Sequence, residues 1–313
     1  MTTELNMTNG TVVFVDILGF GALTQNAIKP SNPCYHAWGE VGAFDPYILA
    51  TRILSTFRDV LSESDANYSD VSFAQLSDGA FIWGQNTSRV FEAAVEVMQA
   101  LVKKGVLCRA GGATGTYIEP ETADAHLGRF ILGEAVTRAV CIESQGKGMR
   151  FWCDEASFDA INSTTRSPLK PILRVSNPME YNEAFEIVWH MPIKRDWLAI
   201  PHEDPIAANA EANEFLEIFF ENLANLVANP RFIWNEESNQ GRIHIEASIE
   251  AMLAHLKQYA DRYFRDGFCM VNKIKEDIEG SGARSWEVSL QLKGEWLILG
   301  KHNFSYEYKT AIK

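Results

Sequence analysis

Residues 11–21 read Thr11-Val12-Val13-Phe14-Val15-Asp16-Ile17-Leu18-Gly19-Phe20-Gly21. The run up to Ile17 is rich in Val and Phe, which is typical of a central β-strand. Asp16 lies inside this run, and a carboxylate in an apolar strand is costly unless it is paired or binds a cation. Gly19 and Gly21 follow the strand, where backbone N–H groups can approach an anion. We therefore expect a charged site at the end of this strand.

The flanking sequence predicts a β-α-β-β-α-β order. Apolar residues recur at helical spacing in two segments, and short runs of β-branched and aromatic residues mark the strands between them. The expected elements are a strand at 11–17, a helix at 48–61, strands at 71–76 and 80–83, a helix from 88 to 105 and a strand at 106–113. Asp78-Gly79 is a hairpin signal between the two middle strands. This order predicts a ferredoxin-like α+β fold.

Outside this core, the sequence predicts a less regular arrangement. Residues 26–44 are expected to form a loop, and Gly111 and Gly112 are expected to break the strand at 106–113. The remaining expected elements are a helix at 131–144, strands at 151–152 and 185–189, helices at 207–228 and 246–264, and a hairpin at 286–299. The residue pattern changes near residue 195, after which the expected elements are mainly long amphipathic helices. We therefore expect a catalytic domain at 1–194 and a helical plus β-hairpin domain at 195–313, with a dimerisation or sensor role.

Asp16 and Asp78 are the candidate metal ligands. If the first strand neighbours the hairpin, as the βαββαβ order predicts, the two carboxylates converge at one edge of the sheet. Two carboxylates and a backbone carbonyl offer the oxygen ligands that Mg²⁺ or Mn²⁺ prefers, and substrate phosphates usually complete such a site. A turn-forming role for Asp78 and a salt-bridged strand end for Asp16 are the structural alternatives. The two together favour the metal site.

Four motifs resemble those of the class III nucleotidyl cyclases, in order and in spacing. They are Phe14-Val15-Asp16-Ile17-Leu18-Gly19-Phe20, Gln75-Leu76-Ser77-Asp78-Gly79, Cys108-Arg109-Ala110-Gly111-Gly112-Ala113-Thr114-Gly115 and Gly133-Glu134-Ala135-Val136-Thr137-Arg138-Ala139. The match covers roughly residues 11–189. The resemblance implies a class III cyclase catalytic domain and a reaction that closes a nucleoside triphosphate to its 3′,5′-cyclic monophosphate, releasing pyrophosphate.

The resemblance also implies roles for individual residues. Asp16, Asp78 and the backbone carbonyl of Ile17 would hold two Mn²⁺ or Mg²⁺ ions per active site. Arg109 would bind the triphosphate together with the turn formed by Gly19, Phe20 and Gly21. Because family members pair with their active sites at the interface, we expect a homodimer in which one chain supplies the metals and the other the contacts to base and ribose.

Several positions depart from the purine-specific pattern of the family. Ala74 stands where a base-reading Lys is usual, and Phe130 replaces an acidic or polar base reader. Thr137 and Cys141 occupy the positions of the transition-state Asn and Arg, and Arg138, one residue away from the first of these positions, is a candidate replacement approaching from the partner chain. The structural alternative for Arg138 is a surface salt bridge.

This pattern resembles the bacterial pyrimidine cyclases of anti-phage (Pycsar) signalling, which act on UTP or CTP. A large aromatic side chain would fill the space left by a smaller base, and Phe44, Tyr47 and Phe130 are the candidates. One hydrogen-bonding side chain decides between uracil and cytosine, and we place UTP ahead of CTP. A purine cyclase, an inactive nucleotide-binding module of cyclase fold and a polymerase-like palm are the alternatives.

Composition sets the remaining limits. The 313 residues are 46% hydrophobic, which is ample for a core, and carry a formal net charge of −13. Net acidity argues against nucleic acid as a partner and against a polybasic membrane contact, because affinity for backbone phosphates comes from clustered Lys and Arg. The five cysteines show no Cys-x-x-Cys spacing, and no apolar run approaches the ~20 residues of a membrane helix. We expect a reduced cytoplasmic protein.

Overall fold

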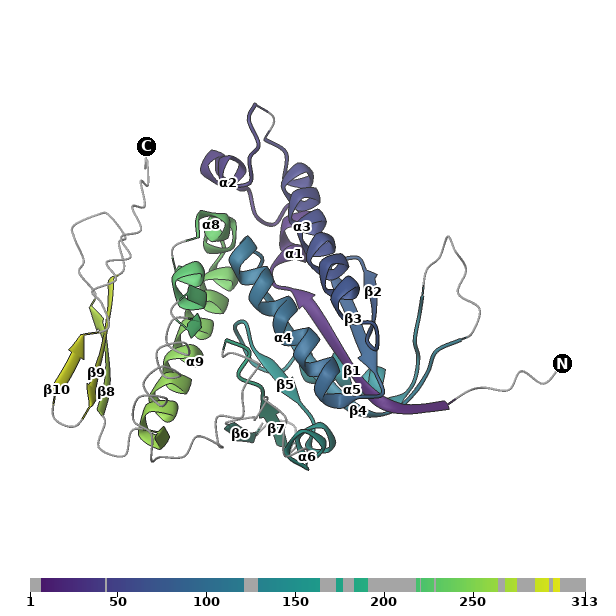
Figure 1. Ribbon diagram of the computed structural model, residues 1–313. Helices are drawn as coiled ribbons and strands as arrows, with labels where there is room; N and C mark the ends of the chain where they lie inside the picture. The colour runs from purple at the N-terminus through teal and green to yellow at the C-terminus, as the bar shows by residue number, and fades with distance from the viewer. Residues whose placement is uncertain are drawn as a thin grey trace.

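The computed structural model describes residues 7–42, 44–120, 129–163, 173–176, 183–190, 218–219, 221–227, 229–263, 268–274, 285–292 and 295–298. A seven-stranded sheet forms its centre, and helices cover both faces of that sheet (Figure 1). A separate three-stranded sheet lies beyond the last long helix of the chain.

The sheet contains the predicted βαββαβ unit. In chain order this unit consists of β1 (Met7–Ile17), α3 (Pro46–Asn67), β2 (Ser72–Leu76), β3 (Gly79–Gly84), α4 (Thr87–Lys104) and β4 (Cys108–Ile118). The strand order is β2-β3-β1-β4-β5-β7-β6, and β1 pairs antiparallel with both β3 and β4. The first four strands therefore have the ferredoxin-like order, and the prediction of a central β1 is confirmed.

Strand alternation divides the residues of β1 between two cores. Val13, Val15 and Ile17 pack in the core formed with α3 and α4, whereas Val12 and Phe14 pack in a second cluster on the opposite face. Helix α5 (Glu134–Glu143) covers this opposite face. Because side chains alternate along a strand, Asp16 lies on the α5 face of the sheet.

The other elements complete the two faces and the edges. They are α1 (Phe20–Thr24), α2 (Asn32–Ala37), β5 (Phe151–Cys153), α6 (Glu155–Ser163), β6 (Leu173–Ser176), β7 (Glu183–Glu186), η1 (Pro230–Phe232), α8 (Ile233–Glu236), α9 (Asn239–Tyr263), β8 (Phe268–Ile274), β9 (Ser285–Leu292) and β10 (Glu295–Ile298). Strands β9 and β10 pair antiparallel on either side of residues 293–294, so the predicted hairpin is confirmed.

Four local predictions were wrong, and the fourth concerns Gly111 and Gly112. The predicted loop at 26–44 contains the short helix α2, which begins next to Pro33. Asn86, and not Ser88, caps helix α4, and its side chain accepts a hydrogen bond from the backbone N–H of Arg89. Residues 187–189 lie beyond the end of β7.

Gly111 and Gly112 do not break β4, which continues through them to Ile118. A Cβ atom on Gly111 would lie 2.2 Å from the backbone nitrogen of Glu143 and 2.3 Å from the carbonyl oxygen of Ala139. This glycine therefore serves to let α5 pack directly on β4.

The C-terminal helices share the main core. Their buried apolar residues belong to the same cluster as those of β1, α3 and α4; they are Phe219, Leu223, Leu226, Val227, Phe232, Trp234, Ile245, Ile249 and Met252. The predicted helix at 207–228 is described only over 218–219 and 221–227, and most of the proposed boundary region lies outside the described residues. The division at residue 195 stays a prediction.

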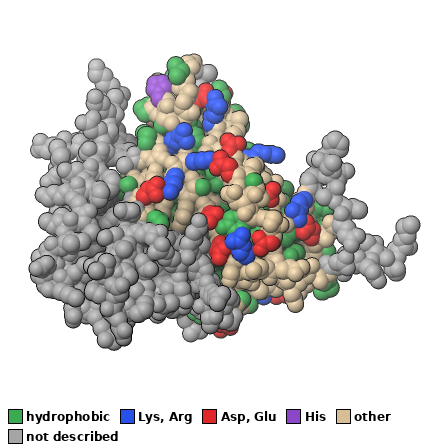
Figure 2. Space-filling model, viewed as in Figure 1, with side chains coloured by type: hydrophobic (Ala, Val, Ile, Leu, Met, Phe, Trp, Pro, Cys, Tyr) green, Lys and Arg blue, Asp and Glu red, His purple; other side chains and the backbone are tan. Residues whose placement is uncertain are grey.

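The surface mixes charges of both signs. On the face seen in Figure 2, acidic and basic side chains are interspersed over the described residues. None of the helices in the described ranges combines the length and the apolar character needed to cross a membrane.

Candidate functional site

Backbone pairing brings Asp16 and the Asp78 hairpin together at one end of the sheet. Asp16 lies opposite Gly79 on β3, and the N–H of Ile17 donates a hydrogen bond to the carbonyl oxygen of Asp78, with N and O 3.0 Å apart. A Cβ atom on Gly79 would lie 2.7 Å from the Phe14 ring and 3.6 Å from Oδ1 of Asp16. A glycine is therefore needed for the hairpin to pass this close to β1.

Arg109 and Glu143 complete the surroundings of Asp16. Arg109 lies directly opposite Asp16 on β4, and its guanidinium forms an ion pair with Glu143 at the end of α5. Glu143 is 4% exposed. Glu143 is not among the site residues predicted from the sequence. The sequence does contain one sign of its burial. Glu143 follows Ile142 and lies four residues after Ala139, which places it on the apolar side of α5.

The electrostatics of this end of the sheet are unbalanced. Burial and the charges of Glu143 and Asp78 raise the pKa of Asp16 to about 7, and the nearby Arg109 opposes the shift. Burial also raises the pKa of Glu143, against the effect of its bond to Arg109. Three carboxylates thus face one guanidinium, which is an arrangement that a bound cation would stabilise.

The donor set fits a hard divalent cation. Two carboxylates and a nearby backbone carbonyl are all-oxygen donors, which suit Mg²⁺ or Mn²⁺ better than zinc or copper. Among the residues that the structure describes, no group of three or more His, Cys, Asp or Glu side chains is placed to hold a metal ion. The site therefore fits an ion that takes one or two carboxylates and completes its coordination with water and substrate phosphates.

The glycine turn directly follows β1. Gly19 has φ 83°, a left-handed conformation that favours glycine, and its carbonyl oxygen accepts hydrogen bonds from the N–H groups of Ala22 and Leu23 in α1. The side chain of Phe20 is buried in the main core. Only the backbone of Phe20 is thus available for the predicted contact with the triphosphate.

The aromatic residues predicted to read the base lie in two places. Tyr47 is 57% exposed in the first turn of α3, and Phe44 contacts the rings of Tyr35 and His36, with ring centroids 5.1 and 5.6 Å apart. Phe44 lies just before α3 and contacts Tyr35 of α2, so both residues belong to the start of α3, which lies near α2 in Figure 1.

Phe130 lies farther along the sheet. It is 52% exposed, and its neighbour Arg129 stacks on Trp83, which pairs with Val12 of β1. Val12 is four residues from Asp16, a distance of about 14 Å along a strand. Ala74 lies opposite Phe81 on β3. A single chain therefore does not bring Phe130 to Asp16.

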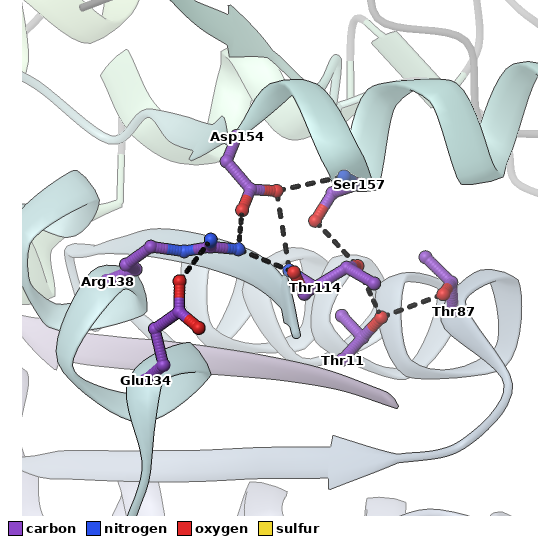
Figure 3. A network of polar contacts seen from close by, with 7 residues as sticks. All are labelled: Thr11, Thr87, Thr114, Glu134, Arg138, Asp154 and Ser157. Carbon is purple, nitrogen blue, oxygen red and sulfur yellow. Dashed lines mark hydrogen bonds and ion pairs between the residues drawn. The ribbon is translucent and has the colours of Figure 1, made fainter. Parts of the chain in front are cut away.

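Arg138, on α5, belongs to a network of polar contacts that joins α5, β4 and α6 (Figure 3). Its guanidinium donates to the carbonyl oxygen of Thr114 and forms ion pairs with Asp154 and Glu134. Hydroxyl contacts of 2.7 to 2.9 Å extend the network through Thr114, Ser157, Thr11 and Thr87.

This network lies away from the carboxylates. Thr114 pairs with Thr11, which is five residues from Asp16, or about 17 Å along β1. Thr137 is exposed on α5, where its hydroxyl donates to the carbonyl oxygen of Gly133 at 3.3 Å. Within one chain, neither Arg138 nor Thr137 meets Asp16, and their predicted roles need a second chain.

Comparisons with known proteins give matches only among solved structures. No protein-family model matches the chain, and no curated protein does. The guanylyl cyclase Cya2 is 13% identical, with a TM-score of 0.45 over 62% of this chain and 96% of that chain. The adenylyl cyclase CyaB from P. aeruginosa is 15% identical, with a TM-score of 0.42 over 59% and 96% of the two chains.

A dimeric guanylyl cyclase domain of the RhoGC fusion protein from the aquatic fungus Blastocladiella emersonii is also 15% identical. Its TM-score is 0.41, over 58% of this chain and 98% of that chain. Because all three TM-scores lie below 0.5, the fold is assigned from the strand order and register of the chain itself.

Proposed function

We propose that this chain is a metal-dependent nucleotidyl cyclase, which converts a nucleoside triphosphate to its 3′,5′-cyclic monophosphate and pyrophosphate. The observation that carries the proposal is the meeting of Asp16 and the Asp78 hairpin beside Arg109, in three of the four motifs that resemble the class III cyclases. The raised pKa of Asp16 supports a site that is electrostatically incomplete without a cation.

In this proposal, Asp16, Asp78 and the carbonyl of Ile17 hold the divalent ions. When bound, the ions would lower the pKa of the ribose 3′-hydroxyl and offset the charge on the departing pyrophosphate. Arg109 exchanges its bond to Glu143 for one to the triphosphate, and the N–H groups of residues 19–21 orient the phosphates. These residues act by positioning the triphosphate and by balancing its charge.

A second copy of the chain would supply the remaining contacts. Thr137, Arg138 and Phe130 lie away from Asp16 within one chain, so a pairing that places them over the other chain's carboxylates would complete two equivalent sites. Exposed apolar side chains in the same region, Leu132 and Val140, support such a contact.

Pyrimidine triphosphates are the proposed substrates, with UTP ahead of CTP. Position 74 holds Ala instead of the Lys, and position 130 holds Phe instead of the polar residue, with which purine-specific members of the family recognise the base. The exposed side chains of Tyr47 and Phe130 are available to fill the space left by a smaller base. We further propose that the product is a cytoplasmic second messenger of anti-phage defence.

An inactive nucleotide-binding module is the second candidate. Thr137 and Cys141 at the positions of the family's transition-state pair favour it, as does the engagement of Arg109 by Glu143. In that case the chain would bind a nucleoside triphosphate with Mn²⁺ and release it unchanged.

Incubation of the pure protein with Mn²⁺ and each of the four ribonucleoside triphosphates separately, with products identified by mass, tests these proposals. We expect cyclic UMP and pyrophosphate from UTP and a smaller yield of cyclic CMP from CTP, both abolished by EDTA. A cyclic purine nucleotide as the main product would contradict the pyrimidine proposal. Binding without any product would favour the inactive module.

A further inference from the structure

The C-terminal segment contacts the turn that follows Asp16. The side-chain Nδ2 of Asn235, in α8, donates a hydrogen bond to the carbonyl oxygen of Leu18 at 3.2 Å, across 217 positions of sequence. A Cβ atom on Gly19 would lie 3.4 Å from this Nδ2 and 3.4 Å from the Trp234 ring. Asn235 is 1% exposed, so this contact is sealed from solvent.

Asn235 is itself held rigidly. Its carbonyl oxygen accepts the N–H of Ser238 at 3.3 Å and the Ser238 hydroxyl at 3.2 Å. A Cβ atom on Gly241 would lie only 1.8 Å from the same oxygen, so α9 begins as close to Asn235 as a glycine allows. The amide group therefore reaches Leu18 from a fixed position.

The bond fixes a peptide plane that the proposed site uses. In a trans peptide the C=O and N–H groups point in opposite directions, so holding the oxygen of Leu18 also orients the N–H of Gly19. On the other side, the N–H of Leu18 donates to the carbonyl oxygen of Leu107 at 2.8 Å, which orients the carbonyl of Ile17. Asn235 and Leu107 together determine the direction of one proposed metal ligand and one proposed phosphate donor.

Stability alone does not explain this asparagine. Its Oδ1 is buried and has no hydrogen-bond partner within the part of the chain that the structure describes. A buried polar atom without a partner lowers stability, and an apolar side chain of similar size would avoid this cost. Retaining the amide is therefore consistent with a need for the Nδ2 contact at Leu18.

The C-terminal segment forms hydrogen bonds to two further parts of the chain. The carboxylate of Glu237 accepts the N–H of Ser31 at 2.9 and 3.2 Å, which ties α8 to the start of α2. Nδ1 of His244 accepts the N–H of Gly148 at 3.0 Å, on the loop that follows Glu143. Residues 234–244 thus contact the chain after Asp16 and the chain after Glu143, on both sides of the proposed site.

We propose that Asn235 is a positioning residue of the active site, through which the C-terminal segment sets the geometry of the turn at residues 18–21. This inference rests on the proposed cyclase function, because the turn matters only if Ile17 and Gly19 serve ion and phosphate. It implies that the C-terminal segment is needed for metal and triphosphate binding, and not only for stability.

Asn235→Ala and Asn235→Ser test the proposal, since neither side chain reaches Leu18 with a donor. Asn222 provides the matched control: it is fully buried in the helix at 221–227, its Nδ2 donates to the carbonyl oxygen of His190 at 3.4 Å, and its Oδ1 lacks a partner among the described residues. Full-length variants are compared for thermal unfolding, for Mn²⁺ affinity from the EPR signal of free Mn²⁺, and for hydrogen exchange of peptides covering residues 16–23.

We expect the Asn235 variants to exchange faster at residues 16–23 and to weaken Mn²⁺ binding by about 10-fold, because loosening the Leu18 carbonyl also loosens the neighbouring peptide that carries the Ile17 ligand. Asn222→Ala should lower the melting temperature similarly while leaving both readouts within about twofold of wild type. Equal effects from the two positions, or wild-type behaviour of the Asn235 variants, would overturn the proposal.

The two proposals fail in different ways. If the wild-type protein binds no Mn²⁺, the metal-dependent cyclase proposal is wrong. Hydrogen exchange at residues 16–23 requires no metal, and unchanged exchange in Asn235→Ala would by itself show that Asn235 does not hold the turn.

Discussion

The two ends of the α5-covered face of the sheet differ in how well their charges are matched. Around Asp16, three carboxylates share one guanidinium, and the pKa values of Asp16 and Glu143 are both raised. Around Arg138, the guanidinium has two carboxylate partners and a backbone carbonyl, and hydroxyl groups continue the network to the α4 side of the sheet. The first end is arranged to gain a cation, whereas the guanidinium of the second end, called the closed end below, already has two carboxylate partners.

The largest expected effect is at the unbalanced end. Asp78→Asn removes a proposed metal ligand while keeping the size of the side chain, so turnover of the preferred triphosphate should fall by more than about 100-fold. The measurement is the initial rate of cyclic nucleotide formation at saturating Mn²⁺. Asp59→Asn, on the exposed side of α3, is the matched control and should retain wild-type turnover. Turnover by Asp78→Asn at the control rate would contradict the metal assignment.

Glu143→Gln should change how Mn²⁺ affinity depends on pH. The Glu143 charge is the largest carboxylate contribution to the raised pKa of Asp16, so its removal lets Asp16 ionise at lower pH. We expect the pH at which Mn²⁺ binding reaches half its maximum to move downward, with affinity at pH 6 rising about fivefold to tenfold. Glu134→Gln, at the closed end, should leave the profile unchanged; an equal shift in both variants would remove the distinction between the two ends.

Asp16→Asn should stabilise the metal-free protein at high pH. The folded pKa of Asp16, about 7, exceeds its ordinary value of 3.8, so ionisation costs stability as the pH rises through this range. We expect the free energy of unfolding to exceed that of wild type by about 1 kcal/mol at pH 8, after allowance for solvent screening, and to converge with it near pH 4. Urea unfolding in EDTA at several pH values measures this difference, and a constant difference would refute the explanation.

The smallest effect is expected at the closed end. Thr87→Val removes one hydroxyl contact of the network, the 2.8 Å bond from Thr11, and should lower the free energy of unfolding by about 0.5–1 kcal/mol. Mn²⁺ affinity should not change, because the bond lies away from the carboxylates. Weaker Mn²⁺ binding in this variant would mean that the two ends do not act separately.

The parts of the site that follow from local pattern were predictable. The alternation of β1 fixes which face Asp16 occupies, and the Asp78-Gly79 turn fixes the register of the hairpin beside it. The presence of α3 and α4 likewise follows from their apolar spacing, whereas α3 extends six residues beyond the predicted end at residue 61. The four aligned motifs located Arg109 as well.

Residues that act through tertiary packing were not predictable in this way. Only the packing of α5 on β4 distinguishes Glu143 from the other acidic residues of the chain. Asn235 is 217 positions from the carbonyl that it contacts. Gly111 and Gly112 suggested a broken strand because glycine weakens strands in general, but here close packing of α5 requires Gly111. Local preference was overridden by a neighbouring helix in that case.

Because Gly111 has no side chain, the backbone of α5 lies directly against β4. The ten residues of α5 form a helix about 15 Å long, which extends from the Glu134–Arg138 contact to Glu143 and packs directly on the sheet. Because the helix moves as one piece, a displacement of its N-terminal end would also displace Glu143, and with it the ion pair that Glu143 forms with Arg109.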